Sequence, residues 1–248
     1  MKPFLWWMLH SMTVPTNGMS DRLTTWSDRW NDNKIGWHND NVHESFANHG
    51  ERWIPGLTGD ACPNEPSRVL VSLCGKSVDM KYLATRESVA EVVGVDGVRL
   101  SLDTFAKEHP DLELQWESDT VMKGKKLTLM EADFFELTAE DTDGQFDAIF
   151  DRASLVAIDP SLRQDYVNVM GRMLKPGGRI LLVVIERHSG DAEADRTAGP
   201  PFSVTNVEEL YGSQPWVESV TLLEKDAEKE MNAGTDRSSV FYLIQAKS

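Results

Sequence analysis

The sequence lacks several features that would each assign it to a class of protein. Its two cysteines, Cys62 and Cys74, form no Cys-x-x-Cys pair, which argues against a structural zinc site and is typical of a reducing compartment. Basic residues are few, since 25 Lys and Arg stand against 40 Asp and Glu and give a net charge of −15. Nucleic-acid binding depends on neutralising phosphates with Lys and Arg, so this balance argues against a nucleic-acid partner.

Long hydrophobic runs are also absent from the start of the chain. The apolar run Phe4–Leu9 is far too short to span a bilayer and is short for the core of a signal peptide. We therefore expect a cytoplasmic protein with no membrane partner. Residues 1–22 are interpreted as a disordered N-terminal extension, with a cleaved targeting segment as the alternative. Residues 23–248 are long enough and apolar enough to form one domain.

Strand-like and helix-like segments alternate along this domain, which predicts an α/β fold with a doubly wound, mostly parallel sheet and helices on both faces. Seven strands are expected, the last of them antiparallel, and a small hairpin through Gly124 precedes the third. The expected strands are 68–73, 90–96, 127–131, 146–151, 179–185, 217–224 and 239–246, and the expected helices are 78–86, 100–109, 161–174 and 207–211.

The turn after the first strand carries a single glycine. Gly75 follows the apolar run, and Asp96 ends the next strand, which is the spacing at which an α/β sheet holds the ribose of an adenosine cofactor. A dinucleotide loop needs three glycines at set offsets, so the turn favours an adenosine ligand without a pyrophosphate. S-adenosylmethionine is the common one. The alternative for Asp96 is a helix-capping or turn aspartate.

Other residues have the right chemistry for the same ligand. Trp26 and Trp30, one helical turn apart, can attract a methyl sulfonium with their ring faces, or can be the apolar stripe of a core-facing helix. Arg152 follows the fourth strand and offers a planar donor fork, or forms a salt bridge to Asp151 or Glu186. No motif supplies a general base, and the histidine spacings predict no metal site.

The sequence resembles the thiopurine S-methyltransferase family from about Trp26 to the C-terminus. Two of the matching stretches are specific to that family and the others are weaker. The specific ones are Leu73-Cys74-Gly75-Lys76 and Asp151-Arg152-x-x-Leu155-Val156-Ala157-Ile158, and the others include Trp26-x-x-x-Trp30, Ile35-Gly36-Trp37-His38, Gly94-Val95-Asp96, Asp133–Leu137, Gly199-Pro200-Pro201-Phe202 and Leu223-Glu224-Lys225.

The resemblance implies a Rossmann-like fold, S-adenosylmethionine as cofactor, and roles for particular residues. Arg152 would be catalytic, Trp37, Pro201 and Phe202 would face the acceptor, and the cofactor contacts would be Trp26, Trp30, Leu73, Asp96, Asp133, Phe134 and Arg152. Asp133 and Phe134 can equally be a loop aspartate and a core phenylalanine. Two positions depart from the family: Asp96 replaces the usual glutamate, and Met231 stands where thiopurine-active members carry a cation.

We therefore predict a monomeric S-methyltransferase that moves a methyl group to a small thiol, a thiopurine-like heterocyclic thiol, or a sulfide or selenium acceptor by in-line displacement. Three alternatives remain open from the sequence. One is a halide, thiocyanate or oxygen methyltransferase of the same fold, another is a binding protein for S-adenosylmethionine with little turnover, and the third is a nicotinamide oxidoreductase, which the single-glycine turn disfavours.

Overall fold

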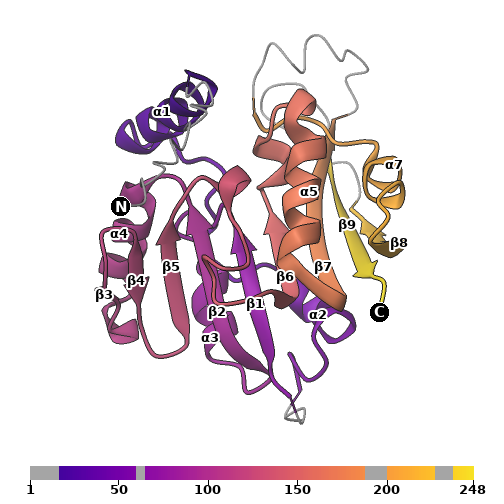
Figure 1. Cartoon of the computed structure of the whole chain (residues 1–248), viewed down its shortest axis with the longest axis horizontal. Helices are drawn as coiled ribbons and strands as arrows, with labels where there is room; N and C mark the ends of the chain where they lie inside the picture. The colour runs from indigo at the N-terminus through magenta and orange to yellow at the C-terminus, as the bar shows by residue number, and fades with distance from the viewer. Residues whose placement is uncertain (1–16, 60–64, 188–199, 227–236) are drawn as a thin grey trace, which may run out of the picture.

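The computed structural model describes residues 17–59, 65–187, 200–226 and 237–248. Its centre is a nine-stranded sheet in the order β3-β4-β5-β2-β1-β6-β7-β9-β8 (Figure 1). The strands are β1 Ser67–Ser72, β2 Val89–Asp96, β3 Gln115–Trp116, β4 Val121–Lys123, β5 Leu127–Glu131, β6 Phe146–Arg152, β7 Leu174–Arg187, β8 Val217–Lys225 and β9 Arg237–Ala246.

The sheet confirms the predicted fold class. The neighbours β5, β2, β1, β6 and β7 are parallel, and β9 is antiparallel to both β7 and β8. All seven predicted strands are present, but the sheet has nine strands, two more than predicted. The hairpin through Gly124 is the antiparallel pair β4 and β5, and β3 extends it at the sheet edge. A strand as short as β3 is too brief to show a two-residue periodicity in the sequence.

Helices cover both faces of the sheet, and one helix lies beyond its end. α2 and α3 pack with α4 on one face, while α5 and α7 pack on the other. Figure 1 shows α1 above the end of the central strands, apart from both layers. The helices are α1 Asn17–Asn31, α2 Ser45–Trp53, α3 Asp79–Ala84, α4 Arg99–Glu108, α5 Arg163–Met173 and α7 Val207–Gly212, with short 3-10 turns at Pro110–Leu112, Phe134–Glu136, Leu155–Ala157 and Pro160–Leu162.

The N-terminal boundary differs from the predicted one. α1 begins at Asn17, within the segment 1–22 that the sequence assigns to an extension. The expectation of disorder for residues 1–16 lies outside the described residues and stays a prediction. Among the helices in the described ranges, none has both the length and the apolar character needed to cross a membrane.

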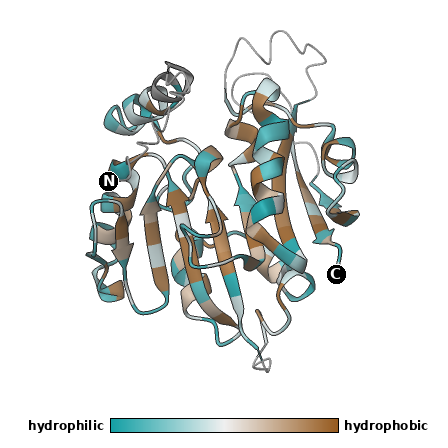
Figure 2. Ribbon diagram, in the orientation of Figure 1, coloured by the Kyte–Doolittle hydropathy of each residue, from teal (hydrophilic) through white to brown (hydrophobic). Residues whose placement is uncertain are grey.

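The central strands are buried on both faces because their side chains alternate between two cores. Leu70 of β1 belongs to the core under α5, while Val69 and Val71 belong to the core under α2 and α3. Figure 2 shows the result as hydrophobic colouring along the middle of the central strands. Parallel strands covered on both faces read as continuous apolar runs, which is why the sequence predicts them well.

Gly94, in the middle of β2, gives a first prediction. A Cβ there would lie 2.5 Å from Met80 Sδ, 2.9 Å from Cys74 Sγ and 3.1 Å from Leu129 Cδ2. We expect Gly94→Ala to lower the free energy of unfolding by about 1–3 kcal/mol, the usual cost of overpacking a core. Urea denaturation measures it. Gly212→Ala is the control, since nothing lies within 4 Å of its Cβ position, and equal stability of the two variants would contradict the packing described here.

Candidate functional site

A cavity of about 590 Å³ opens at the carboxyl ends of the central strands. The segments that follow β1, β2, β5 and β6 line its floor, and α1 with residues 34–43 forms its cover. The order of the sheet reverses at β1, which lies between β2 and β6. Open α/β sheets bind ligands in the crevice at this position, outside the carboxyl ends of the strands.

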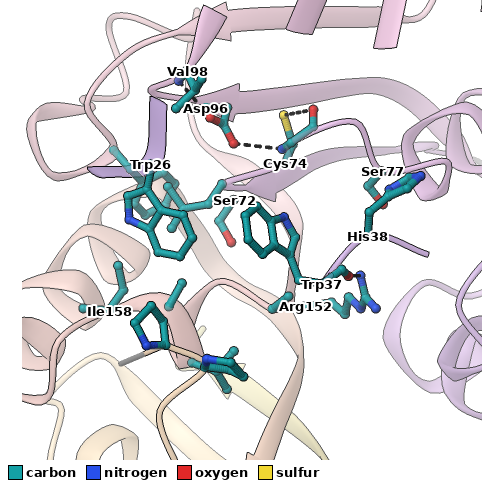
Figure 3. Close-up of a pocket in the computed structure, with 18 of the residues that line it drawn as sticks. Trp26, Trp37, His38, Ser72, Cys74, Ser77, Asp96, Val98, Arg152 and Ile158 are labelled. Carbon is teal, nitrogen blue, oxygen red and sulfur yellow. Dashed lines mark hydrogen bonds between the residues drawn. The ribbon is translucent and has the colours of Figure 1, made fainter. Parts of the chain in front are cut away.

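Asp96, the last residue of β2, holds the turn that follows β1 at the floor of the cavity. Its carboxylate accepts one hydrogen bond from the Gly75 amide at 2.9 Å and another from the Val98 amide at 2.9 Å (Figure 3). Burial raises the pKa of Asp96 to about 6, and the two amides oppose that rise. A carboxylate offers about four lone-pair positions, so Asp96 keeps acceptor capacity for hydroxyl groups of a ligand.

The backbone of this turn is in an unusual conformation. Leu73 has a φ of +41° and Gly75 a φ of +52°. At Gly75 a side chain would also meet Trp30, whose Cζ2 lies 3.3 Å from the position of a Cβ. The single glycine of the sequence motif is therefore required both by its backbone angle and by the helix that covers it.

Three indoles form one wall of the cavity. Trp26 and Trp30 come from successive turns of α1, and Trp37 comes from the loop that follows. The rings of Trp26 and Trp37 meet edge to face with centroids 5.3 Å apart, and those of Trp30 and Trp37 lie 6.2 Å apart. Such a wall provides apolar ring faces and excludes water, a setting in which a cationic sulfonium is attracted to aromatic rings.

Asp133 and Phe134 follow β5, and each is in contact with protein groups. The Asp133 carboxylate accepts from the Phe135 amide at 3.0 Å and forms an ion pair of 2.8 Å with Arg22 of α1. Phe134 is 1% exposed and packs on Tyr166, with ring centroids 5.2 Å apart. Both line the cavity, but the Phe134 ring belongs mainly to the core under α5.

Arg152 lies at the opposite side of the cavity floor. Its Nη1 donates to the Trp37 carbonyl at 2.9 Å, and burial lowers the pKa of its guanidinium while Asp79 opposes that change. The two carboxylates that could have paired with Arg152 have other partners. Asp151 accepts from the Tyr166 hydroxyl and the Leu155 amide, and Glu186 pairs with Lys225.

The remaining predicted residues divide between the cavity and its surroundings. Pro201 lines the cavity beside Pro200. Phe202 is not among the lining residues of the described chain; it is 8% exposed and its amide donates to the Val156 carbonyl at 2.7 Å. Met231 lies outside the described residues. Nine of the ten predicted site residues thus line one cavity: Trp26, Trp30, Trp37, Leu73, Asp96, Asp133, Phe134, Arg152 and Pro201.

Sequence reasoning missed two groups that also face this cavity. Arg22 lies one helical turn before Trp26, so the spacing that identified the two tryptophans could have included it. His43 also lines the cavity, and no motif marks it, because its position depends on Asp79, 36 residues away in the sequence. In the described part of the chain, no cluster of three or more metal-binding side chains occurs.

The fold is that of solved class I methyltransferases. A 1,6-didemethyltoxoflavin N1-methyltransferase from Burkholderia thailandensis superposes with a TM-score of 0.59 at 15% identity, covering 97% of this chain and 94% of its own. A phosphoethanolamine methyltransferase from Haemonchus contortus gives a TM-score of 0.61 at 14% identity, over 94% of this chain and 59% of its own. These superpositions show that the chain has the class I methyltransferase fold.

The sequence comparison is more specific. The thiopurine S-methyltransferase family profile matches residues 22–245. The chain is 32% identical to the thiopurine S-methyltransferase of Vibrio campbellii over 90% of this chain and 97% of that protein, and 30% identical to the one of Bos taurus over 93% of each. This chain belongs to the thiopurine S-methyltransferase family. The predicted family, the predicted enzyme class and S-adenosylmethionine as the methyl donor are thereby confirmed.

The ion pair between Arg22 and Asp133 predicts how firmly α1 is held over the cavity. The side chains are 27% and 7% exposed, and Arg22 also lies 4.4 Å over the Phe135 ring. We expect Arg22→Ala to lower the free energy of local opening of α1 by about 1 kcal/mol. Amide hydrogen exchange in α1 should therefore become about fivefold faster. Arg52→Ala, at the end of α2, is the control, and unchanged exchange in both variants would contradict a holding role for Arg22.

Proposed function

We propose that this methyltransferase acts on sulfur: its acceptor is a small thiol, a thiopurine-like heterocyclic thiol, or a sulfide or selenium equivalent. The main observation in support is that one cavity combines the Asp96 turn, an indole wall and Arg152. The first two fit an adenosine sulfonium, and the third is a cation beside the space left for a second ligand. The names of the curated relatives support a sulfur acceptor.

The donor end of the cavity would be formed by the glycine turn and α1. Asp96 would accept the ribose hydroxyls, and the exposed backbone at Leu73 and Gly75 would let the cofactor approach closely. Trp26 and Trp30 would cover the sulfonium. Asp133 would accept the adenine amino group on the side of its carboxylate not used by Arg22, with Phe134 contributing the edge of the ring pocket.

The acceptor end would be formed by Trp37, Pro201 and Arg152, with Phe202 as support behind Pro201. A planar heterocyclic thiol fits between an indole and a proline ring. Arg152 is the catalytic candidate because its guanidinium, only partly exposed, would stabilise the negative charge of a thiolate. Its hydrogen bond to the Trp37 carbonyl fixes its orientation toward the same space.

The chemistry needs alignment more than side-chain reactivity. When bound, S-adenosylmethionine supplies an already activated methyl group, which an acceptor sulfur takes by in-line attack. The protein's contribution is to hold the acceptor in line and to exclude water with α1. Positioning of this kind can contribute roughly 7–11 kcal/mol to lowering a barrier.

An acceptor screen tests the proposed function directly. We expect the enzyme to convert S-adenosylmethionine to S-adenosylhomocysteine with aromatic thiols, 6-mercaptopurine and sulfide, and at least tenfold more slowly with iodide, thiocyanate or phenol. Mass spectrometry of the methylated product is the measurement, and an Asp96→Ala variant is the negative control. Preference for a halide or an oxygen acceptor would contradict the sulfur assignment, and cofactor binding without product would contradict turnover.

Asp96 gives a pH-dependent prediction for cofactor binding. The ribose hydroxyls would donate to the ionised carboxylate, whose pKa is raised by burial to about 6, so protonation below that pH removes the binding form. We expect the affinity for S-adenosylhomocysteine to be constant above pH 7 and to fall toward tenfold per unit below pH 6. Calorimetry from pH 5 to 8 measures it.

The matched variants separate this carboxylate from general acid effects. Asp96→Asn should bind at least tenfold more weakly at pH 7.5, since charge-assisted hydrogen bonds contribute about 1.5–3 kcal/mol, and its affinity should no longer change between pH 5 and 7. Asp111→Asn, on the surface near α4, should behave as the wild type. An Asp96→Asn variant with wild-type affinity would remove the ribose assignment.

A further inference from the structure

A sulfur acceptor needs to lose its proton before it can attack. An ordinary thiol has a pKa near 8.5, so only a few per cent is thiolate at neutral pH. The sequence motifs supply no base for this proton, and the described cavity contains few candidates that could serve. One of its lining residues, His43, has the chemistry and the surroundings of a general base.

Hydrogen bonds to Asp79 and Ser45, and packing near two phenylalanine rings, fix the position of His43. Its backbone amide donates to Asp79 Oδ1 at 2.8 Å. Its Nδ1 lies 2.9 Å from Ser45 Oγ and accepts from the Ser45 amide at 3.3 Å. Ser77 Oγ donates to the other oxygen of Asp79 at 2.7 Å. The imidazole also packs near Phe150 and Phe241, with ring centroids 6.3 Å and 6.0 Å away. These contacts engage Nδ1 and the main chain, and within the described residues no hydrogen-bond partner lies at Nε2.

The charges around His43 favour a neutral imidazole that can still accept a proton. Burial and the nearby Arg152 lower the pKa of His43, while Asp79, Glu44 and Asp226 oppose that change. The ring is therefore unprotonated at neutral pH. Arg152 and His43 lie close enough to interact electrostatically, which is the arrangement that a thiol needs: one group to receive its proton and another to stabilise its charge.

The other candidates in the described cavity fit less well. His38 has its Nε2 3.1 Å from the carboxylate of Asp40. A carboxylate accepts hydrogen bonds, so that nitrogen carries a proton and is already engaged. Burial raises the pKa of the Cys74 thiol, which keeps it protonated. Asp151 is completely buried beneath the floor and is bonded to Tyr166 and Leu155.

We propose that His43 is the catalytic base that deprotonates the thiol acceptor, a proposal that rests on the proposed function. In the reactive tautomer, Nδ1–H donates to Ser45 Oγ at 2.9 Å, the longer bond from the Ser45 amide to Nδ1 is given up, and Nε2 carries the lone pair. The acceptor S–H bond breaks, its proton moves to Nε2 and its electron pair stays on sulfur. That sulfur forms the new bond to the methyl carbon, while the methyl–sulfonium bond breaks and leaves its electron pair on the departing sulfur. The imidazolium then releases the proton to solvent.

The test compares two thiols of similar size, each with a benzene ring, that differ in thiol pKa. Benzyl mercaptan is protonated at pH 7, whereas 4-nitrothiophenol is already ionised. For His43→Gln we expect kcat/KM with benzyl mercaptan to fall about 100-fold, the lower range for loss of a general base, and kcat/KM with 4-nitrothiophenol to change less than threefold. Calorimetry with S-adenosylhomocysteine should give wild-type affinity, which establishes that the variant is folded and binds the cofactor.

His49→Gln is the matched control. His49 lies nearby on α2, pairs with Glu224 at 2.8 Å and does not line the cavity described here, so both rates should stay at the wild-type level. Equal losses of the His43 variant on the two thiols, or no loss on either, would overturn the proposal. Wild-type transfer to neither thiol nor any other sulfur acceptor would overturn the proposed function, and the base with it.

The pH profile of the wild-type enzyme is a second measurement, and it does not depend on any variant. With a base at His43, kcat/KM for benzyl mercaptan should be nearly constant from pH 7 to 8.5. Without one, the rate would follow the thiolate fraction and rise close to tenfold per pH unit. A tenfold rise per unit in the wild type, or wild-type activity restricted to 4-nitrothiophenol, would overturn the proposal.

Discussion

The hydrogen bonds of Asp96 determine the shape of the cavity on which the rest of the site depends. One carboxylate at the end of β2 accepts from the Gly75 amide in the turn after β1 and from the Val98 amide in the turn after β2. It therefore joins the two turns, with Gly75 21 residues before Asp96 in the sequence. Removing it would free two buried amides together. The carboxylate therefore has a structural role in these two turns even without a ligand, and this role is compatible with the proposed ribose role.

The cover of the cavity is formed by contacts between α1 and that same turn. Trp30 lies against Gly75, where a Cβ would come within 3.3 Å of its ring, and Arg22 pairs with Asp133 after β5. α1 makes few other contacts with the rest of the fold, and Figure 1 shows it outside the layered core. A helix held by a few groups at the rim can close over a ligand and open again without disturbing the sheet.

Sequence predicted the interior of this protein better than its long-range contacts. β5 was predicted with its observed bounds, because a buried strand has a clear pattern that turn residues interrupt. Asp96 and the tryptophans were found because their spacing reflects local geometry. The pairs Arg22 with Asp133 and His43 with Asp79 are 111 and 36 residues apart, and no local pattern encodes them. Phe202 follows Pro201 in a motif, but a motif does not show which of its members face a cavity. Pro200 and Pro201 line it, whereas Phe202 is 8% exposed and its amide is bonded to the Val156 carbonyl.

The two ends of the cavity are therefore built on different principles. The proposed donor end uses residues whose spacing is set by a strand, a turn and a helix. These residues belong to the family motifs, as does Arg152 at the other end. The proposed acceptor end combines Arg152 with His43. Burial lowers the pKa of both groups, and Arg152 lowers the pKa of His43 further. A cation beside a neutral imidazole favours an acceptor that can be ionised inside the site over one that is permanently charged. No local motif marks His43, because its proposed role depends on the folded arrangement of the loop before α2.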